Sequence, residues 1–373
     1  MAEAIIKEGT LYEVLNKMLG AEVIRASFNE SELQGGTLGD VRLVEGVAET
    51  VNGDSLPYKV VWKKQRKWER PGDPLSWRRE YDLYRSDFGT ICSEVLRWPI
   101  CYHTEMNEAE DEIQIWMEYA EGASGKALTI DMLERAAYEI GRLQGRIYAN
   151  PDAVGKLANF GDTGYLRRDY EQWHTLSHNL EAHLSEYSEL TNEQKQQLRD
   201  GKVRLREGES FEYTYLRTDY CHIPQHLKQM IYDIDDNLDA LFEGIARLPV
   251  VLCHRDYWLE NIIYNEGKIR FIDWDTSGWG YLGEDLASLI ADDYDFDRFE
   301  EFCERFIPAY YKGVGEYMDV SAIASGGERN FIKEMILLKF GYRQVQNYIF
   351  AEEDEEEDRI EAVKALQKIY EMK

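Results

Sequence analysis

The stretch HRDYWLEN at residues 254–261, followed by IDWD at residues 272–275, decides the fold expected of this chain. In phosphoryl transfer from a nucleotide, one aspartate accepts the proton of the attacking hydroxyl group, while an asparagine and a second aspartate hold magnesium against the phosphates. Asp256, Asn261 and Asp273 stand in that order, and His254 precedes the first of them. Such residues also serve as turn and capping residues, but the four together are much rarer by chance. The stretch therefore predicts a catalytic loop for phosphoryl transfer.

Apolar segments on both sides place this motif among strands. Residues 248–252 (LPVVL) predict a buried strand that leads into His254. Residues 262–264 and 268–272 predict a β-hairpin that turns at residues 265–267 (NEG). Such a hairpin would return Asp273 to the side of Asn261, so we expect these two residues to be the magnesium ligands.

Charge and composition exclude two classes of partner. The chain has 373 residues, of which 44% are apolar, and a net charge of −28. A phosphate backbone would be repelled by this charge, so a nucleic-acid partner is not expected. There is no apolar run of membrane-spanning length and no signal pattern at the N-terminus, so a membrane partner is not expected either. The acidity is compatible with a cationic substrate, and equally with solubility alone.

The cysteines indicate a reducing compartment. The chain has five of them, scattered and without C-x-x-C spacing. This pattern favours free thiols over a disulfide framework, and we expect a cytoplasmic protein.

The N-terminal part has the pattern of a small antiparallel sheet. Residues 4–19 predict a helix, and residues 22–28, 41–51 and 57–63 predict strands, the last two joined at an Asn52-Gly53-Asp54 turn. A glycine-rich segment between the first two strands contains Gly35, Gly36 and Gly39. Glycine lets backbone N–H groups approach a phosphate. Most segments of this kind are simple hairpin turns, so the prediction that this one binds phosphate depends on the residues that follow.

A lysine on the third strand completes a nucleotide-binding pattern. Lys59, Lys63, Lys64 and Lys67 are candidates, and Lys63 in VVWK matches the strand lysine that grips nucleotide phosphates in kinases. Residues 75–85 predict a helix that carries Glu80 as the partner of this lysine. Residues 113–117 predict a strand, followed by a polar linker in which the backbone of Glu118 and Ala120 would bind adenine.

Helices dominate the rest of the chain. We expect them at residues 133–148, 169–186, 191–200 and 221–246, and through the tail from residue 297, which predicts an α+β chain with a nucleotide-binding lobe at 1–118 and a helical lobe at 119–373. His174 and His178 have a metal-binding spacing, but the apolar residues around them favour an ordinary amphipathic helix. The acidic run at residues 352–358 predicts a solvated helix face or loop.

These motifs resemble the aminoglycoside phosphotransferase/choline kinase-like family, which has a bilobal protein-kinase-like fold. The resemblance runs from the glycine-rich segment to Ala287 and is strongest at residues 254–275. It implies an enzyme that uses ATP, or GTP, with Mg²⁺, and in which Asp256 is the catalytic base and Lys63 with Glu80 anchors the phosphates. Arg255 departs from the family, which usually has a small residue there, and the glycine-rich segment is not G-x-G-x-x-G.

The short connection after Asp273 favours a small-molecule acceptor over a protein. Protein kinases carry tens of residues between the metal-binding aspartate and the A-P-E motif, whereas here Asp285 begins D-L-A shortly after Asp273. We expect Asp285 to cap a helix. Asp256, Asp275 and Asp292 are the expected acceptor-binding residues, the last of them in an acidic cluster with Asp293, Asp295 and Asp297.

The sequence thus predicts a kinase that phosphorylates a hydroxyl group of a small acceptor, with an aminoglycoside, a choline-like molecule or another amino alcohol or sugar as candidates. Two alternatives remain open at this point: a non-catalytic binding or scaffold protein on a kinase-like fold, and a metal-dependent hydrolase that uses Asp256, Asp273 and Asp275. The oligomeric state is also open.

Overall fold

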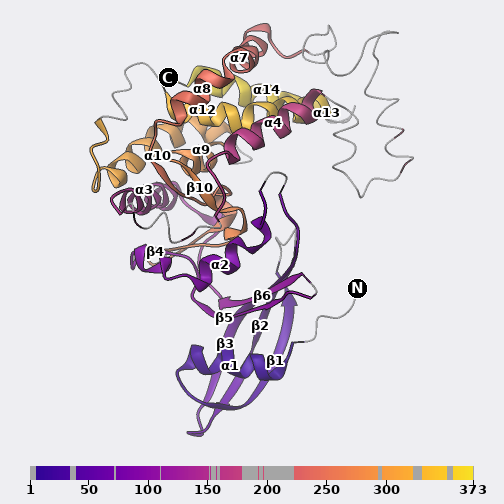
Figure 1. The fold of residues 1–373 in the computed structure, drawn as a ribbon, viewed down its shortest axis with the longest axis vertical. Coiled ribbons are helices and arrows are strands. Elements are labelled where there is room, and N and C mark those ends of the chain that lie inside the picture. The colour runs from indigo at the N-terminus through magenta and orange to yellow at the C-terminus, as the bar shows by residue number, and fades with distance from the viewer. Residues whose placement is uncertain are drawn as a thin grey trace. The chain divides into compact units, whose positions relative to one another are not determined.

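The computed structural model describes residues 6–33, 39–70, 73–109, 111–150, 152, 157, 160–178, 192, 196, 222–292, 296–321, 330–350 and 356–372 (Figure 1). The chain forms two compact units. The first, here the sheet unit, comprises Met1–Met132, Ala149–Gly161 and Leu259–Gly278. The second, here the helical unit, comprises Leu133–Tyr148, Asp162–Trp258 and Trp279–Lys373. A functional division at residues 118 and 119 stays a prediction.

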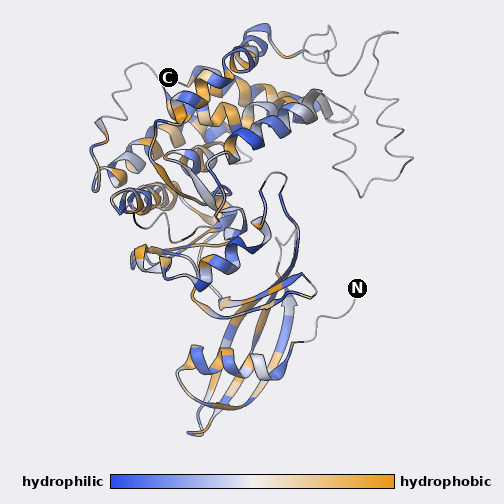
Figure 2. Ribbon diagram, viewed as in Figure 1, coloured by the Kyte–Doolittle hydropathy of each residue, from blue (hydrophilic) through white to orange (hydrophobic). Residues whose placement is uncertain are grey.

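The sheet unit is built on a five-stranded antiparallel sheet. Its strands lie in the order β1 (Val23–Glu32), β2 (Gly39–Thr50), β3 (Ser55–Arg66), β6 (Glu112–Glu118) and β5 (Cys101–Asn107). Hydrophobic and hydrophilic residues are interspersed along these strands (Figure 2). The hairpin expected at Asn52-Gly53-Asp54 joins β2 to β3. The expectation omitted β5, whose residues are all half-buried and show no alternation of buried and exposed positions.

Helices cover both faces of this sheet. Leu11, Val14 and Leu15 of α1 (Glu8–Leu19) pack with Val60 and Trp62 of β3. On the opposite face, Trp77 and Tyr81 pack with residues 113, 115 and 117 of β6. Trp77 lies in a 3₁₀ turn, Ser76–Arg78, and Tyr81 in α2 (Arg79–Arg85). The expected helix at 75–85 therefore starts later, because Leu75 has a φ of 64° and cannot belong to a right-handed helix.

A small three-stranded sheet completes this unit. β9 (Lys268–Phe271) lies between β4 (Leu96–Arg97) and β8 (Ile262–Asn265). The β8–β9 hairpin is the one expected from the sequence. It turns at Glu266 and Gly267, whose φ angles of 47° and 82° suit a two-residue hairpin turn.

The helical unit combines many helices with a two-stranded sheet of β7 (Val250–Cys253) and β10 (Gly278–Tyr281). Within it, α9 packs against α10 and α12, and α13 packs against α4 and α14 (Figure 1). The expected helix at 221–246 is wrong in one respect, since it breaks at Asn237 into two. The helices are α3 (Ile130–Tyr148), α4 (Tyr165–His178), α7 (Gln225–Asp236), α8 (Leu238–Ile245), α9 (Glu284–Ala291), α10 (Phe299–Val314), α12 (Phe331–Ile336), α13 (Tyr342–Phe350) and α14 (Glu356–Glu371).

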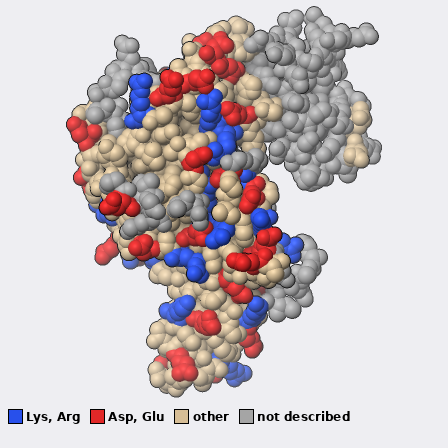
Figure 3. Space-filling model, in the orientation of Figure 1, with Lys and Arg blue, Asp and Glu red and all other residues tan. Residues whose placement is uncertain are grey.

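Several expectations fall on residues outside this description. The helix expected at 191–200 lies almost wholly outside the described residues, as do residues 179–186 of the preceding one and residues 352–355 of the acidic run. Acidic side chains lie scattered among basic ones on the face drawn in Figure 3. Among the described residues, no helix combines the length and the apolar character needed to cross a membrane.

Candidate active site

Lys63 is the centre of a charged cluster in the sheet unit. Its Nζ donates hydrogen bonds to Glu80 Oε2 and to Asp273 Oδ1, each at 2.6 Å. Glu80 is 1% exposed, whereas a third of the Asp273 side chain is exposed. Strand β3, helix α2 and the segment after β9 thus meet at one cation. The structure brings together the three residues that the sequence expectation grouped as the phosphate anchor and the downstream aspartate.

Burial and charge act in opposite directions on this cluster. Burial by itself would lower the pKa of Lys63, but the carboxylates of Asp273 and Glu80 raise it well above its usual value. The lysine therefore stays protonated. Burial raises the pKa of Glu80, and the nearby Lys63 opposes this effect. A charged ammonium group at this position suits the binding of anionic oxygen atoms.

The β8–β9 hairpin brings Asn261 and Asp273 side by side. Ile262 pairs with Phe271, and the backbone N–H of Ile272 donates to the Asn261 carbonyl at 3.1 Å. Asp273 itself has a φ of 61°, in the left-handed region that costs energy for a residue other than glycine. Strain of this kind persists only where surrounding contacts fix the residue, as the Lys63 ion pair does here.

This pair of residues fits Mg²⁺ by its chemistry. Mg²⁺ prefers oxygen ligands and is usually held by one or two carboxylates together with substrate phosphates. Asp273 supplies a carboxylate that is one-third exposed, and Asn261 supplies an amide. Among the described residues, no group of three or more His, Cys, Asp or Glu side chains could hold a metal ion. Asp273 and Asn261 could therefore hold Mg²⁺ only together with further oxygen ligands, such as phosphates.

Two arginines that the sequence analysis missed support this segment. Arg70 donates to the Asp275 carbonyl at 3.1 Å and to Thr276 Oγ1 at 3.0 Å. Arg79 is 1% exposed, donates to the Ser277 carbonyl at 2.9 Å and is ion-paired with Asp73. Asp275, which was expected to bind the acceptor, is 8% exposed and also lies 3.4 Å from Arg70 Nη2. These contacts fix the chain that follows Asp273; an acceptor-binding role for Asp275 stays a prediction.

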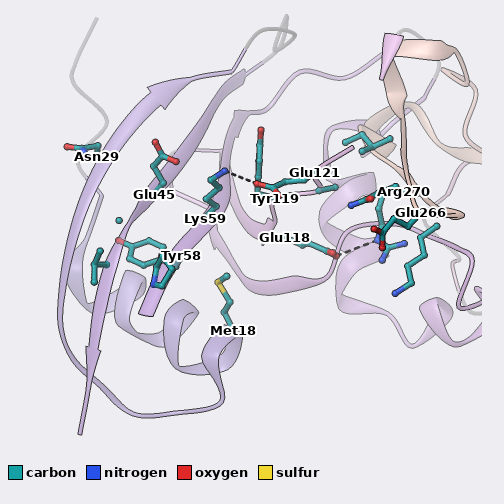
Figure 4. A pocket seen from close by; sticks show the side chains of 17 residues that line it. Met18, Asn29, Glu45, Tyr58, Lys59, Glu118, Tyr119, Glu121, Glu266 and Arg270 are labelled. Carbon is teal, nitrogen blue, oxygen red and sulfur yellow. Dashed lines mark hydrogen bonds and ion pairs between the residues drawn. The ribbon is translucent and has the colours of Figure 1, made fainter. Parts of the chain in front are cut away.

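A cavity of about 730 Å³ lies in the sheet unit beside the linker that follows β6 (Figure 4). Its wall includes residues 118–121, β3 around Lys59, and the β8–β9 hairpin. The Glu118 carboxylate points to Arg270 and Arg97 and accepts from the Ile100 N–H at 3.0 Å. Its side chain therefore holds the linker in place. A nucleotide contact from the backbone of Glu118 or Ala120 stays a prediction.

The glycine-rich segment is described only at its end. Gly35 and Gly36 lie outside the described residues. Gly39 begins β2 opposite Gln65, and a Cβ atom there would lie 2.5 Å from the Lys64 carbonyl oxygen. The position is therefore restricted to glycine by the close approach of the neighbouring strand.

In the helical unit, the catalytic-loop sequence is held by Asp285. This aspartate is fully buried, and its carboxylate accepts from the N–H groups of His254 at 2.9 Å and Arg255 at 2.8 Å, and from Gln144 Nε2 at 2.9 Å. The expectation that Asp285 caps a helix is wrong. Gly283, with a φ of 108°, precedes α9, and Asp285 lies in its first turn with its side chain directed to the loop.

Arg255 adopts a backbone conformation that favours glycine. Its φ is 70°. Its guanidinium group compensates by donating to the Trp279 carbonyl at 2.7 Å and the Asp162 carbonyl at 3.1 Å, and it lies 4.4 Å from the centre of the Tyr165 ring. These contacts explain how a large residue occupies the position between His254 and Asp256.

Asp256 shares its surroundings with two other carboxylates and one arginine. It acts electrostatically on Asp292 and on Arg343, and Arg343 also lies near Asp169. Burial raises the pKa of Asp292, while Arg343 and Lys339 oppose that shift. Asp292 was expected to bind the acceptor, and Asp293 and Asp295 lie outside the described residues. Asp256 therefore lies within electrostatic reach of Asp292, whose charge Arg343 and Lys339 partly neutralise.

A sequence model of the phosphotransferase enzyme family matches residues 99–319. The chain belongs to this family. Mouse ethanolamine kinase 1 is 37% identical over 82 residues, which cover 18% of this chain and 23% of that protein. Human ethanolamine kinase 1 is 36% identical over 78 residues, 18% of this chain and 17% of that protein. The chain thus spans about a quarter or less of the length of these curated relatives.

Solved structures extend the likeness to nearly the whole chain. Choline kinase from Cryptosporidium parvum Iowa II has a TM-score of 0.54 at 16% identity, covering 92% of this chain and 89% of its own. Plasmodium vivax ethanolamine kinase has a TM-score of 0.50 at 13% identity, covering 92% and 82%. The likeness confirms the α+β, protein-kinase-like fold expected from the sequence.

Membership of the phosphotransferase enzyme family also confirms the resemblance drawn from the motifs. Within this family member, one unit holds Lys63, Glu80, Asn261 and Asp273, and the other holds His254, Asp256 and Asp292. The sequence analysis missed Arg70, Arg79 and Arg343, and it missed the role of Asp285. The D-L-A sequence pointed to Asp285 but suggested a helix cap, and nothing in the sequence alone singles out the three arginines.

Proposed function

We propose that the chain is an ATP- and Mg²⁺-dependent kinase that transfers the γ-phosphate to a hydroxyl group of a small acceptor. The observation that carries this proposal is the Lys63 cluster. A charged lysine, a buried glutamate and an aspartate that is one-third exposed beside an asparagine form the set that phosphoryl transfer requires. A scaffold protein would have no need of a strained aspartate at this position.

Each residue has a distinct role in the proposed reaction. Lys63 binds phosphate oxygen atoms, and Glu80 orients it. Asp273 and Asn261 would hold Mg²⁺, which would offset the negative charge of the phosphates. Asp256 accepts the proton of the acceptor hydroxyl as its oxygen bonds to the γ-phosphorus and the bond from that phosphorus to the bridging oxygen breaks. His254 and Asp285 position the loop that carries Asp256, since the Asp285 carboxylate binds the N–H groups of residues 254 and 255.

A cationic amino alcohol is the acceptor class that we propose. Three features support it: the short connection between Asp273 and Asp285, the carboxylates of Asp169 and Asp292 near Asp256, and similarity to proteins named ethanolamine kinase. The net charge of −28 would steer such a cation toward the protein.

The test is ATP consumption in the presence of Mg²⁺ with a panel of acceptors: ethanolamine, choline, an aminoglycoside, neutral sugars, nucleosides and a basic protein. We expect turnover with an amino alcohol and its loss in Asp273→Asn. Asp239→Asn, whose side chain is 81% exposed, is the matched control and should keep full activity. Phosphorylation of the basic protein and of none of the small molecules would refute a small-molecule acceptor. Full activity of Asp273→Asn would refute the role of Asp273 as the metal ligand.

A further inference from the structure

One arginine of the helical unit lies in surroundings that would suit a bound cation. Arg343 belongs to α13, which packs against α4 (Figure 1). Its guanidinium carbon lies 4.8 Å from the centre of the Trp173 ring and 5.2 Å from the centre of the Phe340 ring. Aromatic faces at this distance attract cations through the negative charge density of the ring.

Two carboxylates complete this set, which we call the cation cage: Asp169, Asp292, Trp173 and Phe340. Asp169 Oδ1 lies 3.9 Å from Arg343 Nη2, and Asp292 Oδ1 lies 3.8 Å from Nη1. Both distances exceed hydrogen-bond length. Nine-tenths of the Asp169 side chain is buried, and its Oδ2 has no hydrogen-bond partner among the described residues. Charge and ring contacts, rather than directed hydrogen bonds to these carboxylates, therefore hold the guanidinium group.

The cage lies within electrostatic reach of the proposed catalytic base. Asp256 acts on both Arg343 and Asp292. A buried carboxylate with an unused oxygen needs a cation close by, because an isolated buried charge is costly. In the structure Arg343 provides that cation. An ammonium group on the acceptor has the same charge and the same attraction to ring faces, and so could replace it.

We propose that Arg343 is a specificity-determining residue that occupies the cation cage and competes with the ammonium group of the acceptor. This inference rests on the proposed function, since it assigns the acceptor's charged end to the cage beside Asp256. An acceptor without a positive charge gains nothing from displacing Arg343. The arginine thus weakens the binding of cationic acceptors selectively.

The first experiment compares Arg343→Gln with the wild-type protein on ethanolamine and on a neutral alcohol such as glycerol. We expect KM for ethanolamine to fall by about 3- to 30-fold, the range that one cation–ring contact corresponds to. The kcat should change by less than about twofold, and KM for glycerol should not change. Arg167→Gln is the matched control, because it removes the same charge from α4 at a side chain that is 42% exposed.

The second experiment needs no phosphoryl transfer. Tetramethylammonium binding is measured by calorimetry without ATP, on the wild-type protein, Arg343→Gln and Arg343→Gln/Asp169→Asn. We expect tighter binding in the single variant and a loss of that gain in the double variant. If the gain appears in a protein that phosphorylates no acceptor, the competition between Arg343 and a cation for the cage stands, whereas the proposed function fails and with it the assignment of the cage to an acceptor.

Other outcomes would overturn the inference itself. These are tetramethylammonium binding that is no tighter in Arg343→Gln than in the wild-type protein, or equal changes in KM for ethanolamine and glycerol. If Arg343→Gln does not fold, Arg343→Lys carries the test, because lysine keeps the charge but is more strongly hydrated than a guanidinium group. We expect a smaller gain in tetramethylammonium affinity from this variant, and no gain would refute the competition.

Discussion

Replacing Lys63 by methionine removes the cation that Glu80 and Asp273 share. The new side chain has similar length, so the main change is electrostatic. Each carboxylate loses a nitrogen at 2.6 Å. At an effective dielectric constant of about 20, a contact at this distance corresponds to about 6 kcal/mol of Coulomb attraction. The desolvation of the charged groups offsets much of that attraction in the wild-type protein.

The variant still buries Glu80 but no longer has the attraction of Lys63 that offsets the cost of this burial. We expect the free energy of unfolding of Lys63→Met to fall by about 3–5 kcal/mol, as for other buried pairs broken on one side. Burial already raises the pKa of Glu80, and removal of Lys63 takes away the opposing influence. The folded variant then holds a proton that the unfolded chain releases above a pKa of 4.5. Its stability should therefore decrease as the pH rises.

The assay is urea unfolding of the wild-type protein, Lys63→Met, Glu80→Gln and the double variant at pH 6 and pH 8. The double variant leaves no charge at either position 63 or position 80. Its decrease in the free energy of unfolding should therefore be smaller than the sum of the two single-variant decreases by about 2 kcal/mol or more. Lys59→Met is the matched control on the same strand. Its ion pair with Glu121 is about half exposed, and removing that pair should lower the free energy of unfolding far less than removing the buried pair at Lys63. Additive losses, or a Lys63→Met variant as stable as Lys59→Met, would refute the reasoning.

Three further predictions concern the helical unit. Asp256→Asn should reduce kcat by about 10²-fold or more while ATP affinity, measured by calorimetry, stays within about twofold; unchanged turnover would exclude it as the base. Burial raises the pKa of Glu284 to about 7, so wild-type stability should fall by up to about 3 kcal/mol between pH 4.5 and 7, because the folded state retains a proton there. Thermal unfolding of Glu284→Gln should lack this part of the slope; an identical slope would contradict the assignment. Asp285→Ala leaves the N–H groups of His254 and Arg255 without their acceptor, and it should lower kcat by a larger factor than it changes KM for ATP. Unchanged kinetics would show that the loop keeps its conformation without Asp285.

Local signals account for the parts of the fold that the sequence predicted. Turn residues with positive φ marked both the β2–β3 and the β8–β9 hairpins, alternation of buried residues marked the central part of β3, and an apolar run marked the almost fully buried β6. Strand β5 has no such alternation, because all of its residues are half-buried. Asn237 likewise interrupts a continuous helical pattern without a proline or glycine to mark the break.

The candidate site could likewise be predicted only in part. The hairpin between Asn261 and Asp273 could be predicted from the sequence, and the match of VVWK to the strand lysine of kinases selected Lys63, which is ion-paired with Asp273 in the structure. The role of Asp285 could not be predicted, because its partners lie about thirty residues away and the contact exists only after α9 packs against the loop. The glycine-like backbone of Arg255 was equally hidden, since the contacts that stabilise it come from residues 162, 165 and 279.

The net charge of the chain and the local charges around Arg343 affect the binding of a cationic acceptor in different ways. The net charge of −28 acts through solvent over about one Debye length, roughly 8–10 Å at moderate salt, and so governs how fast a cation arrives. Whether the cation stays depends on groups within a few ångströms, where Arg343 already neutralises Asp169 and Asp292. Added salt should therefore slow the association of a cationic acceptor with the wild-type protein and with Arg343→Gln to the same extent. Because Arg343 must leave the cage before the cation enters it, the difference in affinity between the two proteins should appear mainly as a salt-independent factor in the association rate.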